Sequence, residues 1–474
     1  MRNVWRVIGK LVLAGTAVVV AVLLLTLAPV DRTPARGASY VMQTKVRLEE
    51  LGRQHAHSKM GGLRAGFGKA SLTPTIGAAV DIPEKGQFRS LPLAGYGSRA
   101  GRPATGVLDD LWVKSVACEV GGRTGVIVAL DALIVPREVA ELAWARLEQE
   151  VGLVQGQVYP GATHTHCGPG GWGQGIVAEI FSGGHVPGVR EWICGQILRA
   201  AKAALADLKP ASVGTGGFEA PSFTRNRLVG EAGRLDSRFS LLEFRQEGGG
   251  RAVVGTYSAH ATVYSGRVMN FSGDYPGVWQ REMESSGIEL ALFLAGAVGS
   301  HAPRPPDAGE KGALGMGRAL AVASNQALEK ISMTNRVPWA VGCLEVDLPR
   351  LQLRVTDGLR MREWIGRRLL PIRKSTWLHF VRIGDAVWLG TPCDYSGELA
   401  MDLVDATKGS GVVPVVTSFN GDYVGYVVPS KYYGMNTYET RTMSFFGPQL
   451  PDFLDGLLRE LVTVISGSNW AMPP

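Results

Sequence analysis

The sequence lacks the patterns by which several large classes of protein are identified. Its 474 residues contain no Cys-x-x-Cys pair and no glycine-rich loop with the Lys-Ser/Thr ending that cradles phosphate. There is no low-complexity tract, no obvious short-period repeat and no run of lysine and arginine interleaved with aromatic residues. These absences argue against a P-loop, a repeat architecture and a nucleic-acid partner.

Cysteine is also scarce. The five cysteines are widely spaced and odd in number, so we expect no disulfide framework, although a single bridge stays open. Two of them, Cys118 and Cys194, stand in apolar surroundings and are expected only to pack. Cys167 and Cys393 lie beside the motifs described below, where we expect small site-lining residues rather than ligands.

The composition that remains is globular, with 45% hydrophobic and 19% charged residues. The 62 glycines and 26 prolines suit many tight turns between short elements. A net charge of +7 is modest for this length and does not indicate a nucleic-acid partner. A chain of this size can form one large domain or two ordinary ones.

The longest hydrophobic run, residues 11–30, has about the 20 residues that a membrane-spanning helix needs. Arg2, Arg6 and Lys10 precede it, so the positive-inside rule predicts a cytoplasmic tail at residues 1–10. We interpret the run as an uncleaved, single-pass anchor. Everything after it is then extracytoplasmic, either periplasmic or extracellular. A cleaved signal peptide is the alternative.

Residues 31–60 are polar, contain Pro34 and several charges, and are interpreted as a linker. From residue 61 to residue 474, segments with strand character alternate with segments of helical spacing. Residues 290–295, for example, have the composition of a buried strand, and residues 309–331 that of a long helix. The alternation predicts one continuous α/β domain of layered sheets flanked by helices.

The stretch Thr163–Gly171 holds two histidines at i and i+2, just after a short apolar run. Side chains at this spacing project to the same side of an extended backbone, so His164 and His166 are neighbours. One is suited to binding a metal while the other acts on substrate. The ordinary reading, two hydrogen-bonded histidines with no further role, is not excluded by this motif alone.

This stretch, T-H-T-H-C-G-P-G-G, resembles the T-H-T-H-S-G-P-G-G motif of the neutral (non-lysosomal, alkaline) ceramidase family, with Cys167 replacing the serine. Other segments resemble further motifs of that family in the same order and at similar spacing: 93–97, 101–107, Asn226-Arg227, His260, 272–277, Tyr423 to Tyr426, Tyr438-Glu439 and 446–448. The resemblance implies the family's layered, mixed β-sheets flanked by helices. We expect no C-terminal immunoglobulin-like domain, because the chain ends soon after the last motif.

The resemblance also implies a site. In the family, a zinc ion is held by the first histidine of the motif, a later histidine, a glutamate and a tyrosine. The two histidines and the tyrosine correspond to His164, His260 and Tyr426 in this sequence. His166 is then the histidine that assists proton transfer, and Arg227 is the cation that orients substrate. Zinc accepts histidine nitrogen readily and lowers the pKa of bound water. Tyr426 is either a weak ligand or a donor to the oxyanion.

Two departures from the family pattern bear on activity. Thr391 stands at the position of the glutamate ligand and has no carboxylate, so we expect Asp394, three residues further on, to reach the metal instead. Ala302 stands at the position assigned to a nucleophilic serine, which rules out a serine mechanism there. A catalytic role for the nearby Ser300 and His301 remains an open alternative.

Two hypotheses follow. The first is a membrane-anchored, extracytoplasmic zinc hydrolase that cleaves the amide bond of an N-acyl sphingolipid or related small molecule with metal-activated water. The second is a catalytically degenerate member of the family that binds a lipid or glycan without turnover. Neither hypothesis requires a nucleic acid or an obligate protein partner.

Overall fold

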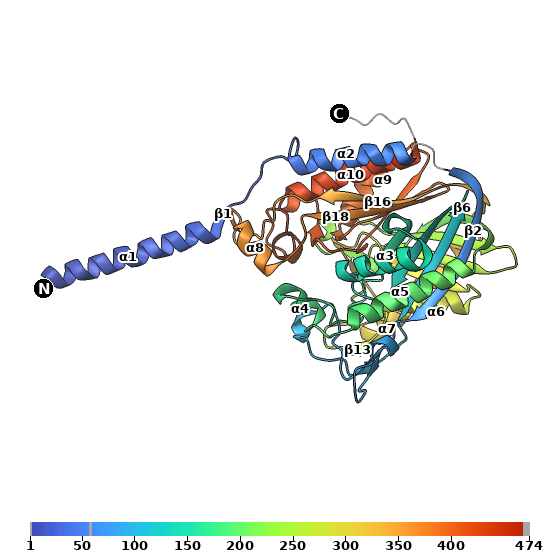
Figure 1. Ribbon diagram of the computed structural model, residues 1–474, viewed down its shortest axis with the longest axis horizontal. Coiled ribbons are helices and arrows are strands. Elements are labelled where there is room, and N and C mark those ends of the chain that lie inside the picture. Colours follow the sequence, from blue (N-terminus) through green and yellow to red (C-terminus); the bar gives the residue numbers. More distant parts are fainter. Residues whose placement is uncertain (1, 56–58, 468–474) are drawn as a thin grey trace.

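A mixed sheet of twelve strands runs through the body of the protein in the computed structural model, which describes residues 2–55 and 59–467 (Figure 1). Its main path has the order β14-β12-β11-β9-β2-β16-β18-β19-β21, and β6, β7 and β8 continue from β2 as a branch. The strands are β2 (Lys59–Ser71), β6 (Trp112–Val120), β7 (Arg123–Leu130), β8 (Val158–Ala162), β9 (Lys209–Glu219), β11 (Arg238–Gln246), β12 (Arg251–Tyr257), β14 (Leu290–Ala295), β16 (Arg336–Asp347), β18 (Ser375–Ile383), β19 (Ala386–Gly390) and β21 (Val413–Thr417).

The sheet curves so that its arms face each other across one apolar core. Phe67 of β2, Phe244 of β11, Leu292 of β14, Trp339 of β16 and Trp388 of β19 all belong to the same buried cluster. Each such side chain contributes roughly 1.5–3 kcal/mol on burial. The alternation of apolar residues in these strands therefore fixes which face of each strand points inward.

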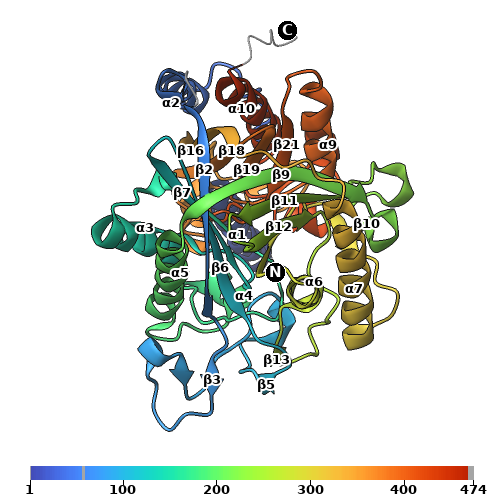
Figure 2. The same cartoon turned by 90° about the vertical axis from the view of Figure 1, so that its right-hand side faces the viewer.

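Helices cover the outer faces of the sheet in three groups (Figure 2). The pair α3 and α5 lies near β2 and β6, α6 and α7 pack near β14 and β9, and α2, α9 and α10 cover β16, β19 and β21. The layered α/β fold predicted from the sequence is thus confirmed. The helices are α2 (Ser39–His55), α3 (Arg137–Val151), α4 (Ile176–Ser182), α5 (Val189–Ala206), α6 (Asp274–Ser285), α7 (Gly309–Leu328), α8 (Glu363–Leu369), α9 (Gly397–Ala406) and α10 (Gln449–Ser466).

Five two-stranded pairs decorate the loops. They are β1 (Leu27–Pro29) with β17 (Leu359–Met361), β3 (Thr75–Ile76) with β4 (Gln87–Phe88), β5 (Gly106–Val107) with β13 (Asn270–Phe271), β10 (Thr224–Asn226) with β15 (His301–Pro303), and β20 (Asp394–Tyr395) with β22 (Tyr426–Val427). The last two pairs carry residues of the candidate site.

The N-terminal apolar run forms α1 (Arg2–Thr26), which projects away from the body with exposed side chains (Figure 1). Residues Val4–Thr26 are long and apolar enough to cross a membrane, as a signal sequence also would be. The tail at residues 1–10 and the membrane span at residues 11–30 stay predictions, and the helix itself has different bounds. Described residues before position 11 continue the helix, and Leu27–Pro29 leave it to pair with β17.

The predicted linker at residues 31–60 needs correction. Ser39–His55 form α2, which packs on β16 and α10. Leu48 and Leu51 are buried in the same apolar cluster as α10, and Thr44 Oγ1 accepts a hydrogen bond from the backbone of Asp347. Apolar residues three apart among many charges gave too weak a helical pattern to be recognised, and the helix depends on the surface it covers.

This packing predicts that α2 stabilises the domain. Replacing Leu48 (3% exposed) by alanine is expected to lower the free energy of unfolding by about 2–5 kcal/mol, because it empties a packed position. Met42→Ala on the same helix (60% exposed) is the matched control and should change it by less than about 0.5 kcal/mol. Urea unfolding of both variants in detergent micelles measures the difference. Equal free energies of unfolding for the two variants would show that residues 39–55 do not stabilise the domain, as expected of a linker.

Candidate metal centre

The candidate site lies in loops that follow the carboxyl ends of parallel strands. His164 follows β8, His260 follows β12, Asp394 follows β19, and Tyr426 lies beyond the end of β21. The pairs β12–β14, β7–β8 and β19–β21 are parallel, so these loops leave the sheet at common edges. Loops at the carboxyl ends of parallel strands are where α/β proteins commonly place their ligands.

His164 is held with one ring nitrogen turned inward. Its Nδ1 lies 2.7 Å from the carbonyl oxygen of Leu133, so Nδ1 carries the proton and Nε2 presents a lone pair. The ring stacks on Phe419, with centroids 3.9 Å apart. Both residues have positive φ, at 60° and 67°, a strained conformation that clusters at functional sites.

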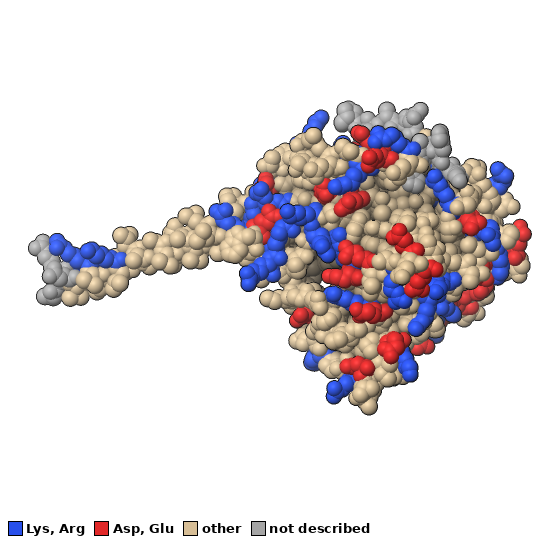
Figure 3. All heavy atoms as spheres, viewed as in Figure 1, with Lys and Arg blue, Asp and Glu red and all other residues tan. Residues whose placement is uncertain are grey.

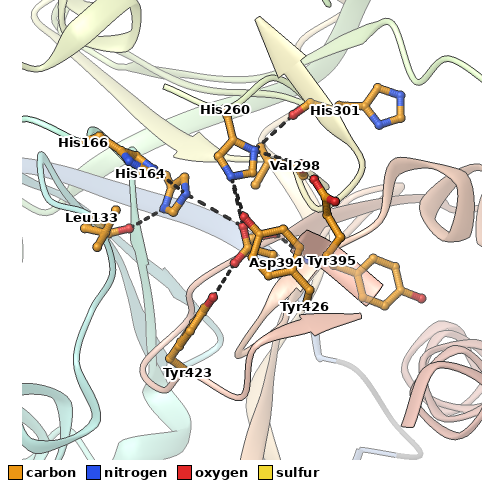
Figure 4. Close-up of polar contacts among 12 residues, drawn as sticks. Leu133, His164, His166, His260, Val298, His301, Asp394, Tyr395, Tyr423 and Tyr426 are labelled. Atoms are coloured by element: carbon orange, nitrogen blue, oxygen red, sulfur yellow. Dashed lines mark hydrogen bonds and ion pairs between the residues drawn. The ribbon is translucent and has the colours of Figure 1, made fainter. Parts of the chain in front are cut away.

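His260 is oriented in the same way (Figure 4). Its Nδ1 lies 2.9 Å from the carbonyl oxygen of Val298 and 3.1 Å from that of His301, which leaves Nε2 as the acceptor facing the centre. Such a bond from the outer ring nitrogen to a carbonyl is the usual support of a metal-binding histidine.

Asp394 completes the inner set. Its Oδ1 lies 3.2 Å from His260 Nε2 and 3.9 Å from His164 Nε2, and makes no hydrogen bond with the described residues. Its Oδ2 accepts a hydrogen bond of 2.7 Å from the Tyr423 hydroxyl. Thr391, which stands at the family's glutamate position, is directed elsewhere, since its hydroxyl donates to the carbonyl oxygen of Thr417. The structure thus brings the predicted Asp394, and not Thr391, to the centre.

Tyr426 and Arg227 form the side of the site opposite His164. The Tyr426 hydroxyl lies 3.1 Å from His260 Nε2 and accepts a hydrogen bond of 2.9 Å from Arg227 Nη2. Arg227 is itself fixed by an ion pair with Glu439, at 2.9 Å from Nε to Oε1. Because the guanidinium already donates to the phenolic oxygen, the remaining lone pair of that oxygen can face the centre.

His166 lies at the rim rather than in the inner set. Its Nε2 is 3.2 Å from His164 Nε2, and its Nδ1 has no hydrogen-bond partner among the described residues. The ring is half-buried and packs on Tyr96, with centroids 4.7 Å apart. The buried Nδ1 packs beside Gly95, whereas Nε2 lies next to the inner set, and the ring lines both cavities described below.

Burial keeps the three imidazoles neutral. Desolvation lowers the pKa of His164 to about 3 and holds the pKa values of His166 and His260 well below their usual range. Desolvation also raises the pKa of the Asp394 carboxyl and that of the Tyr426 phenol. A cation at the centre would favour the ionised form of both oxygen ligands.

The donor set suits a metal ion. Ligand atoms of His164, His166 and His260 all lie within 4.8 Å of one another, and Asp394 Oδ1 is a buried oxygen with no hydrogen-bond donor. A buried acceptor without a donor is costly, and a cation beside Asp394 Oδ1 and the two Nε2 atoms would remove that cost. Two imidazole nitrogens with a carboxylate and a phenolic oxygen match the ligands that zinc accepts.

Two cavities reach this centre from different sides. Both are lined by Gly95, His166, Phe181, Tyr426 and Tyr438. The first continues along α4 and the segment 370–373, where its further lining includes Val177, Ala178 and Ile372. The second continues past Arg225, Arg227 and Ala302. A molecule with two arms can therefore span the centre.

Ser300 and His301, for which a catalytic role was left open, belong to a structural hydrogen-bond network instead. The His301 Nε2 accepts a hydrogen bond of 2.9 Å from the backbone of Asp236, so its Nδ1 carries the proton and donates to Ser300 Oγ at 2.9 Å. Ser300 Oγ lies 2.8 Å from Ser396 Oγ. An imidazole that donates to the hydroxyl cannot take its proton, and the ring points away from the centre (Figure 4). Ala302 pairs with Arg225 in the β10–β15 ribbon.

Sequence reasoning missed several supporting residues. Tyr423 holds Asp394, Glu439 holds Arg227, and Phe419 stacks on His164. Tyr423 and Glu439 stood inside motifs that were matched, without a role attached to them. Buried Arg99 donates to the carbonyl oxygens of Ala94 and His166 and so fixes the histidine loop. Its position in a glycine-rich loop gave no signal of this.

Comparison with known proteins gives a consistent result. Residues 76–291 match the family model described as neutral/alkaline non-lysosomal ceramidase, N-terminal. The neutral ceramidase of Pseudomonas aeruginosa is 25% identical over 259 residues, which are 51% of this chain and 37% of that protein. The alignment thus spans little more than a third of that relative's length.

Solved structures share the fold. A ceramidase complexed with C2 superposes with a TM-score of 0.72 at 18% identity, over 87% of this chain and 77% of the other. The crystal structure of neutral ceramidase from Pseudomonas aeruginosa gives a TM-score of 0.70 at 18% identity, over 87% and 76%. At this identity the likeness establishes the architecture alone.

The geometry predicts that metal affinity depends on Asp394 and not on Thr391. Asp394→Asn is expected to weaken metal affinity at least 10-fold, because the inner oxygen loses its charge, and His164→Ala is expected to abolish binding. Thr391→Val should retain metal, since its hydroxyl bonds only the Thr417 carbonyl oxygen. Elemental analysis and competition with a chromophoric chelator measure content and affinity. Loss of metal in Thr391→Val alone would contradict the assignment.

A second prediction concerns acid stability. Burial lowers the pKa of folded His301 to about 4, against about 6.5 when unfolded, so its contribution is complete above pH 6.5 and is lost as the pH falls. By pH 5 the unfolded state should gain about 2 kcal/mol from protonating this residue. His301→Gln should be less stable at pH 7 but lose less stability between pH 7 and 5, with metal content unchanged. Urea titrations at both pH values test this, and parallel pH profiles would refute it.

Proposed function

We propose that the chain is a divergent member of the neutral/alkaline non-lysosomal ceramidase family and that it is a zinc-dependent hydrolase that cleaves the amide bond of an N-acyl lipid. A ceramide-type hydrolase is the activity that the family and fold support. The observation that carries the finer proposal is the convergence of His164, His260, Asp394 and Tyr426 on one point where two cavities meet.

His164, His260, Asp394 and Tyr426 would hold the metal. Zinc bound there supplies a Lewis acid and a water of lowered pKa. The outer bonds of His164 to Leu133 and of His260 to Val298 keep both rings in place during the reaction. The Tyr423 hydroxyl keeps the Asp394 carboxylate from turning away.

The residues at the rim would handle substrate and proton. His166 is neutral because of burial, its Nε2 lies 3.2 Å from His164 Nε2, and its ring lines both cavities, so it is able to accept a proton from the attacking water and return it to the leaving amine. Arg227, fixed by Glu439 and bonded to Tyr426, presents positive charge to the cavity that carries the carbonyl oxygen of the substrate. With alanine at position 302, no serine is needed in this scheme.

The complete set of inward-facing donors favours an enzyme over a scaffold that binds lipid without turnover. Two cavities, the first lined in part by Val177, Phe181 and Ile372, fit a lipid whose acyl chain and base leave the amide in different directions. We further propose that α1 remains as an anchor and that the domain from residue 61 onward faces the extracytoplasmic side. Arg2, Arg6 and Lys10 at the N-terminal end of α1 support this orientation.

The roles of the two motif histidines separate in one experiment. His166→Ala should retain metal but lose about 10²–10⁴-fold in kcat on ceramide in mixed micelles, because only proton transfer is removed. His164→Ala should lose both metal and activity. Released fatty acid and sphingoid base are quantified by mass spectrometry, with the chelated and zinc-reconstituted parent as controls. If the metal-loaded parent protein binds ceramide but releases no product, the hydrolase hypothesis is wrong and the hypothesis of a lipid-binding protein without turnover is favoured.

A further inference from the structure

The root of α1 is bonded to the body at α8. The backbone of Arg362 donates to the carbonyl oxygen of Thr26 at 2.8 Å, and its Nε donates to that of Leu24 at 2.8 Å. Trp364 Nε1 donates to the carbonyl oxygen of Leu25 at 3.3 Å. These bonds satisfy the last carbonyl groups of the helix, which otherwise lack partners. Together with the β1–β17 pairing, they fix α8 beside the end of the apolar span.

The length of the span sets the height of α8. Residues Val4–Thr26 number 23, which at about 1.5 Å per residue gives about 34 Å. The hydrocarbon core of a bilayer is about 30 Å thick. In a membrane that holds this helix, Thr26 therefore lies at the headgroups, and α8 lies there with it.

The surface around this root is both basic and apolar. Residues 359–374 contain six lysines and arginines and one glutamate, and Arg362, Arg368 and Lys374 are exposed. Figure 3 shows basic side chains gathered on the body beside the root of the projecting helix, next to a hollow. Trp364, an amphipathic side chain typical of membrane interfaces, is 62% exposed.

Helix α4 lies on the side of the body from which α1 projects (Figure 1), and five of its seven residues are apolar. Val177 and Phe181, one turn apart, line the first cavity. Ile176 and Ile180, also one turn apart, face outward and are 66% and 48% exposed. Glu179, between them in sequence, is the charged residue of the helix and is exposed as well. Exposed isoleucines beside the apolar part of a cavity lining are typical of a surface that meets a nonpolar partner.

We propose that this surface, which we define as α4 together with residues 359–374 and call the docking face, rests on the headgroup layer of the anionic phospholipid bilayer that holds α1. Ile176, Ile180 and Trp364 enter the interface, and the basic residues bind lipid phosphates. Since the first cavity opens between α4 and residues 370–373, its mouth then faces the lipid. An N-acyl lipid would pass from bilayer to metal centre without crossing bulk water. This passage rests on the proposed function, whereas the docking itself does not.

The test uses the full chain with a fluorescent reporter. NBD is attached to Ile180→Cys on α4 or, as the matched control, to Glu247→Cys. Glu247 is exposed in the turn between β11 and β12. Strand β12 begins after this turn and ends near His260, so Glu247 and the metal centre lie at opposite ends of β12. The native cysteines in the described residues are buried or half-buried, and the unsubstituted chain reports their labelling.

Each labelled protein is reconstituted in vesicles of phosphatidylcholine with phosphatidylglycerol, with and without doxyl-labelled phospholipid. We expect the emission at position 180 to shift to shorter wavelength and to be quenched several-fold more than at position 247. Equal quenching at the two positions would overturn the proposal. A blue shift that grows with protein concentration in detergent, without quenching by lipid, would also overturn it and indicate a second copy of the chain as the occupant.

Charge reversal isolates the electrostatic contribution. Arg368→Glu with Lys374→Glu should reduce quenching at position 180 several-fold, whereas Arg368→Lys with Lys374→Arg should preserve it. Neither residue lines a described cavity, so hydrolysis of micelle-dissolved ceramide should be unchanged while hydrolysis of vesicle-embedded ceramide falls. A chain without any hydrolase activity would refute the proposed function and leave the fluorescence result to decide the docking. Unchanged quenching after charge reversal would refute binding through lipid phosphates.

Discussion

The structure is arranged around a buried carboxylate that faces two imidazole lone pairs. Asp394, His164 and His260 come from three loops far apart in sequence, and the Asp394 Oδ1 that faces both imidazoles is buried without a hydrogen bond to any described residue. Without a cation this arrangement is costly, because a buried acceptor without a donor is cut off from water. The fold maintains it through the outer hydrogen bonds to Leu133, Val298 and Tyr423, which leave the side chains no other orientation.

Motifs in the sequence located the part of the site that depends on residue type. His164, His260, Tyr426 and Arg227 were named from short patterns, and the structure brings all four together. The layered α/β fold followed from alternating strand and helix periodicity. Asp394 could only be proposed, because its arrival depends on the path of a loop after β19 that no local pattern encodes.

Other parts could not be obtained from the sequence because tertiary contacts decide them. Helix α2 has weak helical periodicity of its own and forms against β16 and α10. His301 stands next to Ser300 in sequence, which left a catalytic role open. The backbone of Asp236 donates to His301 Nε2, so the proton is on Nδ1 and the imidazole donates to the serine hydroxyl instead of accepting from it. Glu439 acts through Arg227, and a residue that acts through another leaves no mark in a pattern of ligands.

The pairing of β1 with β17 has a consequence for how the protein is made. Leu27 is the partner of Met361, 334 residues later in the chain. During synthesis the N-terminal helix leaves the ribosome long before its partner strand exists, so the joint closes only after most of the body has been translated. Until then the helix and the growing domain are connected by a loose chain. The position of the N-terminal helix relative to the body is therefore established late in biosynthesis, by a contact of very high sequence separation.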